Sequence, residues 1–242
     1  MDVGWRERLS DMEAWYDHFL ASDAEAAERS LLWEYQPYAD RLSLFEGRVL
    51  DVGGGAGLAG RFLPPKADYW IIDPSDTWTS FKWREFSKRF TGREFHFVQG
   101  VGEELPFDDC EFDGVLSFWS LNHVQSPAQC MREMRRVLRP AGKCLIVLED
   151  MKPSLIDVMN LWLQEQRQRL GKVTPYPMSW NQSDIESARD TFRHLAARKP
   201  WPLQDDHIRI TERFLKSLLP GRFRLIGRNW KGGFLSWEME RL

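Results

Sequence analysis

The sequence predicts an α/β protein built on a doubly wound, mostly parallel sheet. Strand-like and helix-like segments alternate from residue 48 to residue 148, and this alternation is typical of parallel strands joined by helical crossovers. Near the end of the chain, two apolar segments flank a Lys-Gly-Gly turn at 231–233, which predicts a β-hairpin. A hairpin that closes a parallel sheet brings in one antiparallel strand.

Each expected element follows from local residue signals. Apolar runs bounded by glycine, proline or aspartate predict strands at 48–52, 67–73, 94–98, 114–118 and 143–148. Amphipathic spacing predicts helices over much of 1–45 and at 58–63, 75–90, 126–138, 155–170 and 183–197. The 126–138 helix begins at Ser126-Pro127, an N-cap followed by proline at the first helical position.

Composition narrows the class of protein. The chain has 242 residues, of which 43% are hydrophobic and 29% charged, as expected of one globular domain spanning 1–242. The net charge of −3 argues against a large nucleic-acid surface, because phosphate binding needs clustered cations. The chain has no apolar run of signal-peptide or membrane-span length, so we expect a cytoplasmic protein without a membrane partner.

The stretch RVLDVGGGAGLAG at 48–60 contains two overlapping glycine motifs. One is an acid-first pattern that consists of Asp51, Gly53, Gly55 and Gly57. The other is the Gly-x-Gly-x-x-Gly dinucleotide fingerprint, which begins at Gly55. Either motif places a cofactor in the loop after the first strand.

The position of Asp51 on the strand discriminates between the two motifs. A dinucleotide carries a pyrophosphate, which a nearby carboxylate repels, whereas a cationic or zwitterionic cofactor has no such conflict. Asp73 ends the second strand, where an acidic side chain can bind ribose hydroxyls in either case. The acid-first motif is therefore favoured, and an NAD-dependent oxidoreductase is a minor alternative.

Further motifs follow in a fixed order: WIIDPS, GVGEELPFDDCEFDGVL and RVLRPAGKCLIV. With VLDVGGGAG, this ordered set resembles the class I S-adenosylmethionine-dependent methyltransferases, in particular the small-molecule group. The resemblance covers roughly 45–150 and the terminal hairpin, and implies a seven-stranded sheet whose last strand is antiparallel. The chain departs from the family pattern at Val101, where a polar residue is common, and at Ala141, where glycine is common; we expect the alanine to be harmless.

The resemblance also implies how the chain is divided. Residues 1–45 are expected to form a helical lid and 46–150 the cofactor-binding core. Residues 151–221 are expected to form a substrate-side insert, and 222–242 the hairpin. S-adenosylmethionine is the implied cofactor.

Roles for individual residues follow from the same resemblance. Gly53, Gly55 and Gly57 are expected to bring backbone close to the methionine part of the cofactor. Asp51 is expected to orient this loop or to accept a hydrogen bond from the cofactor's ammonium group. Asp73 is expected to bind the ribose hydroxyls.

The remaining cofactor positions lie after the second, third and fourth strands. Pro74 is expected to pack near the adenine, which Val101, Gly102 and Glu103 would border. Ser117 lies at the end of the fourth strand and is expected to face the methyl group.

Two histidines are candidate catalytic bases, since imidazole titrates near neutral pH. His123 follows the fourth strand, where a role in loop packing is the alternative, and His207 lies in the insert beside two aspartates. Asp150 and Asn160 follow the fifth strand, but the sequence contains no complete set of oxygen ligands. We therefore expect a metal-independent enzyme.

Aromatic residues outside the core are candidates for a substrate pocket, which suggests a small acceptor of apolar or aromatic character. They are Trp15, Tyr16, Trp33 and Tyr38 in the lid, and Trp162, Tyr176 and Trp180, with Met178, in the insert. The leading hypothesis is a small-molecule methyltransferase. A macromolecule methyltransferase acting on RNA or protein, and a cofactor-binding protein without turnover, remain alternatives, and the oligomeric state stays open.

Overall fold

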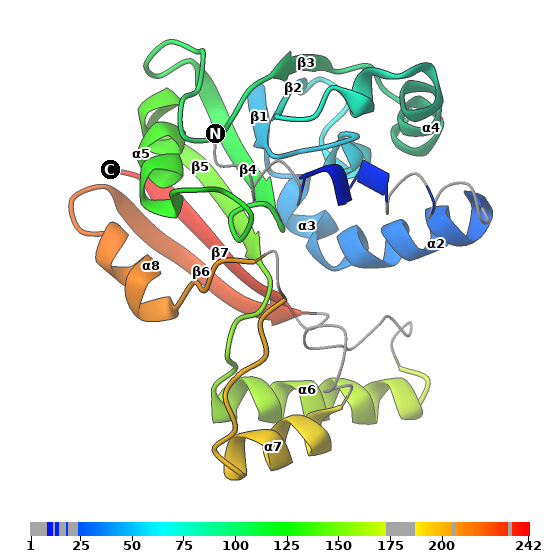
Figure 1. Ribbon diagram of the computed structural model, residues 1–242, viewed down its shortest axis with the longest axis vertical. Coiled ribbons are helices and arrows are strands. Elements are labelled where there is room, and N and C mark those ends of the chain that lie inside the picture. The colour runs from blue at the N-terminus through cyan, green and yellow to red at the C-terminus, as the bar shows by residue number, and fades with distance from the viewer. Residues whose placement is uncertain are drawn as a thin grey trace.

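A computed structural model describes residues 9–11, 13, 14, 18, 24–172, 187–204, 207–231 and 234–242. Its centre is a seven-stranded sheet with the strand order β3-β2-β1-β4-β5-β7-β6 (Figure 1). The strands are β1 (Arg48–Val52), β2 (Asp68–Asp73), β3 (His96–Gln99), β4 (Phe112–Phe118), β5 (Leu138–Leu148), β6 (Phe223–Lys231) and β7 (Phe234–Arg241). The order reverses between β1 and β4, which creates a switch point at the carboxyl ends of these two strands.

The strand directions confirm the predicted architecture. Strands β1 to β5 pair in parallel. β7 lies antiparallel between β5 and β6, with Cys144 opposite Met239. The terminal hairpin therefore supplies the antiparallel strand, β7, of the described sheet.

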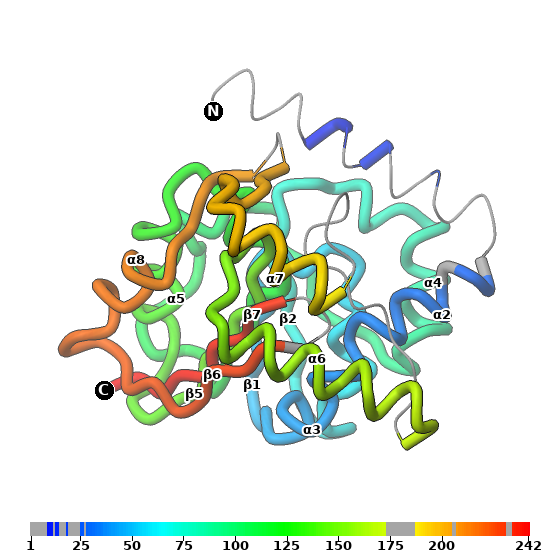
Figure 2. Tube along the Cα trace, turned by 90° about the horizontal axis from the view of Figure 1, so that it is seen from below, coloured from blue at the N-terminus to red at the C-terminus, as the bar shows by residue number. Residues whose placement is uncertain are grey.

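Helices cover both faces of the sheet. α2, α3 and α4 lie on one side, and α5 and α8 lie on the other (Figure 1). The α-helices are α2 (Ala24–Tyr35), α3 (Ala39–Leu42), α4 (Phe81–Thr91), α5 (Pro127–Val137), α6 (Leu155–Arg169), α7 (Ala188–Ala196) and α8 (Glu212–Leu218). α6 and α7 lie side by side beyond the end of β5, as Figures 1 and 2 show.

The alternation of side chains along β4 gives the molecule two apolar layers. Val115 packs into the layer under α5, and the next residue, Leu116, packs into the layer under α2 and α4. Both side chains are fully buried. Because both faces of the central strands are buried, their sequences are nearly continuous apolar runs.

Two expected helices take different forms. Residues 58–63 were expected to be α-helical, but Leu58–Phe62 is a 3₁₀ segment η2, which begins after left-handed Gly57 and ends before two prolines. The expected helix at 75–90 is divided into a 3₁₀ turn η3 (Thr77–Thr79) and α4. The division lies at Ser80, whose extended backbone, with φ −62° and ψ 151°, interrupts the helical path.

The loop within β5 overturns one expectation. β5 has four residues between Leu138, which pairs with Phe112, and Lys143, which pairs with Gly114, where β4 has only Asp113. Ala141 in this loop has a φ of 60°. This left-handed backbone costs an alanine roughly 1 kcal/mol or more, so the expectation that alanine is harmless here was wrong.

Candidate active site

The glycine loop after β1 depends on backbone conformations that favour glycine. Gly53, Gly55 and Gly57 have φ values of 70°, 52° and 72°. A Cβ atom on Gly53 would lie 2.4 Å from the Cβ of Ser120, and one on Gly57 would lie 2.4 Å from Ile71 Cδ1. Glycine is therefore required both by φ and by the close approach of neighbours.

Asp73 ties the glycine loop to the end of β2. Its carboxylate accepts hydrogen bonds from the backbone N–H of Gly55 (3.0 Å), the backbone N–H of Ser75 (3.0 Å) and the indole N–H of Trp78 (2.9 Å). Burial raises the pKa of Asp73 to about 6, although these hydrogen bonds act in the opposite direction. The Asp73 carboxylate thus fixes the conformation of the glycine loop, where a cofactor is expected to bind.

Asp51 lies beneath the same loop. Tyr69 donates a hydrogen bond to Oδ2 of Asp51 at 2.6 Å, whereas the buried Oδ1 has no hydrogen-bond partner among the described residues. Burial raises the pKa of Asp51 to about 6, and the charge of Asp73 adds to the rise. A buried carboxylate oxygen without a donor costs free energy, so this atom fits a cationic donor supplied by a ligand.

The loop after β3 lies against the start of α5. The Glu103 carboxylate accepts a hydrogen bond from the backbone N–H of Ser126 at 2.9 Å. Gly102 is packed tightly, since a Cβ atom there would lie 2.7 Å from Cys130 Sγ. The Glu103 side chain is thus directed to the helix N-terminus, while Val101 is only partly buried. Pro74, after β2, accepts a hydrogen bond from Gln99 through its carbonyl.

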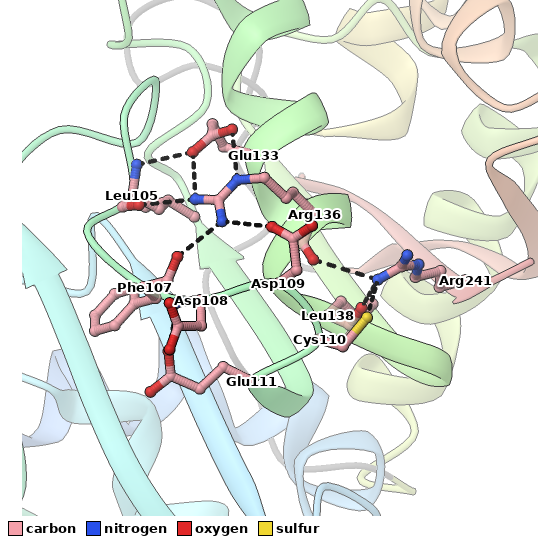
Figure 3. A network of polar contacts seen from close by, with 10 residues as sticks. All are labelled: Leu105, Phe107, Asp108, Asp109, Cys110, Glu111, Glu133, Arg136, Leu138 and Arg241. Atoms are coloured by element: carbon pink, nitrogen blue, oxygen red, sulfur yellow. Dashed lines mark hydrogen bonds and ion pairs between the residues drawn. The ribbon is translucent and has the colours of Figure 1, made fainter.

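Arg136 fixes the rest of this loop (Figure 3). Its guanidinium donates to the carbonyls of Leu105 (2.8 Å) and Phe107 (2.7 Å) and to Asp109 (2.9 Å). Glu133 pairs with Arg136 at 2.8 Å and also accepts from the backbone N–H of Leu105 at 3.0 Å. The hydrogen bond from Glu133 raises the pKa of Arg136 further above its usual range, although burial opposes the rise. Sequence reasoning did not identify this clamp, although Glu133 and Arg136 have the spacing of a helical ion pair.

Arg241 extends the same contact region from β7 (Figure 3). Its guanidinium donates to the carbonyl of Leu138 and lies 3.2 Å from Cys110 Sγ. The terminal strand therefore helps to hold the segment that precedes β4.

Ser117 is fully buried at the end of β4. Its Oγ lies 2.6 Å from the Oγ of Ser120, which in turn donates to the carbonyl of Val52 at 2.7 Å. The next position but one, Trp119, has a left-handed φ of 53°. This geometry couples the loop after β4 to the glycine loop after β1.

Aromatic side chains of α2 and of the 3₁₀ turn that follows it, Gln36–Tyr38, pack against the end of β4. Tyr35 lies 5.2 Å from Phe118 and 4.9 Å from Trp119, measured between ring centroids, and Tyr38 contacts the same two rings. The ring of Phe234 in β7 also contacts Trp119, with a centroid distance of 5.3 Å. The expected lid residue Tyr38 thus contributes to the buried core.

Of the other residues expected to line a pocket, two lie in the part of the chain that the structure describes. Trp33 and Trp162 are exposed by 42% and 51%. Trp15, Tyr16, Tyr176, Met178 and Trp180 lie outside the described residues.

The two candidate histidines come together at the carboxyl ends of β4 and β5. Their ring centroids lie 4.4 Å apart, with the planes almost perpendicular. Glu149 Oε2 lies 3.8 Å from His123 Nε2 and 3.1 Å from His207 Nε2. Glu149 was not identified from the sequence, because a single acid after an apolar strand carries no distinctive pattern.

His207 is held by carboxylates on both sides. Its Nδ1 lies 2.5 Å from Asp150 Oδ2, and its side chain is only 1% exposed. Burial alone would lower the pKa of His207, but Asp150 and Glu149 raise it to about 10. The His123 side chain is 31% exposed, so of the two candidate bases it is the accessible one.

Asn122 connects the three segments that carry this cluster. Its side-chain amide donates to the carbonyls of Glu149 (3.2 Å) and Ile208 (3.3 Å), and its Oδ1 accepts from the backbone N–H of Glu149 (3.2 Å). The backbone N–H of Ile208 donates to the carbonyl of Asn122 at 2.8 Å. A fully buried amide thus fixes the positions of His123, Glu149 and His207 relative to one another.

Glu34 of α2 adds an acidic side chain near this cluster. Burial raises the pKa of Glu34 to about 7, and the charge of Glu149 contributes to the rise. Helix α2 therefore approaches the same end of the sheet.

Among the described helices, none is long and apolar enough to cross a membrane.

Comparison with known proteins agrees with this geometry. The family model described as a methyltransferase domain matches residues 50–146. The ubiquinone/menaquinone biosynthesis C-methyltransferase UbiE of Bartonella henselae is 29% identical over 171 residues, which cover 68% of this chain and 62% of the relative. The chain therefore spans less than two thirds of the length of the curated relatives it matches.

Solved structures share the fold at lower sequence identity. The PH0226 protein of Pyrococcus horikoshii is 19% identical, with a TM-score of 0.54 and coverage of 88% of this chain and 90% of that chain. A SAM-dependent methyltransferase of Thermotoga maritima, described as a possible histamine N-methyltransferase, is 15% identical, with a TM-score of 0.51 and coverage of 93% and 99%. Residues 50–146 therefore match a methyltransferase domain, in agreement with the class I, S-adenosylmethionine-dependent type that the ordered motifs resemble.

Proposed function

We propose that this protein transfers a methyl group from S-adenosylmethionine to a small-molecule acceptor of apolar or aromatic character. The observation that carries the proposal is the glycine loop held between two buried carboxylates, Asp51 and Asp73, at the switch point of a class I methyltransferase sheet. The curated relative from Bartonella henselae is named for C-methylation in quinone biosynthesis, which supports an acceptor of this character.

The cofactor site has one feature that fits a zwitterionic ligand. The ammonium group of the methionine part can donate to Asp51 Oδ1, which is buried and has no partner among the described residues. The left-handed φ values of Gly53, Gly55 and Gly57 set the path of the loop whose backbone is proposed to approach the ligand. When bound, S-adenosylmethionine supplies an electrophilic methyl group on a sulfonium.

Asp73 is proposed to bind the ribose. Its Oδ2 accepts one hydrogen bond, from Gly55, and a carboxylate oxygen has two lone pairs. Capacity for a ribose hydroxyl therefore remains at this atom. Pro74, Val101, Gly102 and Glu103 are proposed to border the adenine, where the Glu103 carboxylate acts through its contact with α5 rather than directly.

The acceptor side is proposed to lie at the histidine cluster. Hydrogen bonds of Ser117 and Ser120 connect the loop after β4, which carries His123, to the end of β1 before the glycine loop. His123 is proposed to take a proton from an acceptor hydroxyl or amine, since its side chain is the accessible one. His207 is proposed to act through Glu149, because its own ring is buried.

Calorimetry with the purified protein tests the proposal. We expect S-adenosylmethionine and S-adenosylhomocysteine to bind with micromolar dissociation constants and NAD not to bind. Asp73→Asn is expected to weaken both adenosyl ligands at least about tenfold, as for loss of a charged hydrogen bond. Asp76→Asn is the matched control, because Asp76 is an exposed neighbour.

Three outcomes would count against parts of the proposal. Binding of NAD alone would show that the glycines serve a dinucleotide. Equal affinities for Asp73→Asn and the wild type would refute the ribose role. Transfer of a labelled methyl group to an RNA or protein fraction, but to no small acceptor, would favour the macromolecular alternative.

A further inference from the structure

The cluster of His123, Glu149 and His207 has the geometry of a metal site. One ligand atom from each side chain lies within 4.8 Å of the others. Glu149 Oε2 is 3.1 Å from His207 Nε2 and 3.8 Å from His123 Nε2. Ligands about 2.0–2.2 Å from a common ion lie roughly 3–3.5 Å apart, so only small side-chain movements are needed to enclose one.

We propose that these three side chains bind a divalent transition-metal ion. Two imidazoles and one carboxylate suit Zn²⁺, Fe²⁺, Co²⁺ or Mn²⁺, whereas Mg²⁺ and Ca²⁺ favour sites built from oxygen ligands. The sequence-based expectation of a metal-independent enzyme considered oxygen ligands only. It did not consider two histidines that are far apart in the chain.

The surroundings of His207 support a ligand role. Its Nδ1 contacts Asp150 Oδ2 at 2.5 Å, and the backbone N–H of Gln204 also donates to this oxygen at 2.9 Å. Metal-binding histidines commonly donate their second ring N–H to such a carboxylate, which fixes the tautomer and directs the other nitrogen to the ion. With its proton on Nδ1, His207 presents the Nε2 lone pair to Glu149 and His123.

The site is also pre-organised by the backbone. Asn122 is fully buried and joins the segments that carry the three ligands through hydrogen bonds to Glu149 and Ile208. Asp150 has a left-handed φ of 53°, a strained conformation that is found more often at functional sites than elsewhere. These features hold the ligands in place before any ion binds.

The partly exposed edge at His123 gives the ion access to a further ligand. An acceptor oxygen is a suitable one, since this edge lies at the carboxyl end of β4, beside the proposed cofactor site. A hydroxyl bound to a divalent ion loses its proton more readily to water. In the metal-loaded protein, His123 would therefore act as a metal ligand rather than as the base. This part of the inference, the activation of an acceptor hydroxyl, rests on the proposed function.

Metal titration of the untagged, chelator-treated protein tests the site directly. Co²⁺ is the probe, because its visible absorption reports the number and type of ligands, and Zn²⁺ is then used to displace it. We expect one equivalent of Co²⁺ to bind wild-type protein, and His123→Ala and Glu149→Gln to weaken binding at least about a hundredfold. Asp150→Asn is expected to weaken it about tenfold, as for a positioning carboxylate.

His96→Ala is the matched control. His96 Nε2 pairs with Asp68 Oδ1 at 3.2 Å on β3, so it offers a histidine–carboxylate pair outside the cluster. Binding of Co²⁺ should be unchanged in this variant. Circular dichroism shows whether each variant is folded, and Zn²⁺ should raise the melting temperature of the wild type but not that of His123→Ala.

Clear results would overturn the inference. Wild-type protein that takes up no Co²⁺, or variants at His123 and Glu149 that bind it as tightly as the wild type, would show that the cluster is an ion-pair network only. Loss of binding in His96→Ala with retention in His123→Ala would place the ion elsewhere. Because no adenosyl ligand or acceptor is present, these results are independent of whether the protein transfers methyl groups.

Discussion

Replacement of Asp51 by asparagine should stabilise the protein in a way that depends on pH. The carboxyl of Asp51 is 1% exposed, accepts one hydrogen bond from Tyr69, and has one oxygen without a partner among the described residues. Burial raises its pKa from 3.8 to about 6. Ionisation of this side chain at neutral pH therefore opposes folding.

The size of the effect follows from the two pKa values. A group whose pKa is raised on folding stabilises the protein at pH values below the unfolded pKa, and this contribution is lost as the pH rises through the folded pKa. The difference between 3.8 and about 6 corresponds to roughly 3 kcal/mol at about 1.4 kcal/mol per unit. Asparagine does not ionise, so the variant does not lose this stability as the pH rises.

Urea unfolding of both proteins at a series of pH values measures the prediction. In the variant, a buried amide N–H₂ group replaces the oxygen that has no partner, which lowers the free energy of unfolding by about 1–2 kcal/mol. This loss is the same at every pH. The variant should therefore gain about 2–3 kcal/mol relative to the wild type between pH 4 and pH 8. Asp76→Asn, which alters an exposed neighbour, should show no such pH-dependent gain.

The same variant should bind S-adenosylmethionine about tenfold more weakly, because it loses a charged acceptor for the ammonium group. A stability difference that does not change between pH 4 and pH 8 would refute the reasoning about burial. Undiminished affinity would refute the reasoning about the ammonium group. The two results are separate, so either part can fail alone.

Three further changes test other parts of the structure. Arg136→Lys should lower the free energy of unfolding in urea by about 2–3 kcal/mol, because lysine cannot reproduce the forked hydrogen bonds of the guanidinium. Arg132→Lys, a change at an exposed arginine of the same helix, should have little effect. Ala141→Gly should raise it by up to about 1 kcal/mol, since glycine adopts the left-handed φ of 60° without strain; a loss of stability would contradict this. In metal-free protein, the raised pKa of His207, about 10, predicts stability that is present below pH 6.5 and declines toward pH 10 by at most about 1.4 kcal/mol per pH unit. His207→Gln should remove this decline.

The fold could be predicted from the sequence because its signals are local. The apolar run of β1 ends in glycines, Ser126-Pro127 begins α5, and the sequence Lys-Gly-Gly lies between the apolar segments of β6 and β7. Each of these signals depends on neighbours within a few residues. The left-handed backbone at Ala141 had no such signal, because alanine does not favour this conformation.

The candidate site could be predicted only in part, because sequence signals are local and part of the site is not. Asp51, Asp73 and the glycines belong to one motif and its continuation along the chain. The histidine cluster depends on three distant segments that only the folded sheet brings together, and Asn122 and Glu149 carry no pattern of their own. Periodicity and spacing report secondary structure, whereas such contacts depend on the tertiary packing of loops.

Ser120 contacts both the glycine loop and the segment that carries His123. Ser120 Oγ donates to the carbonyl of Val52, and its Cβ occupies the space next to Gly53 that a larger residue would need. His123 follows three positions later, and its backbone N–H donates to the Ser120 carbonyl at 3.0 Å. A displacement of the glycine loop on ligand binding would therefore be transmitted to His123 through Ser120. This connection gives a physical reason why the side chains that face an acceptor could respond to the occupancy of the cofactor site.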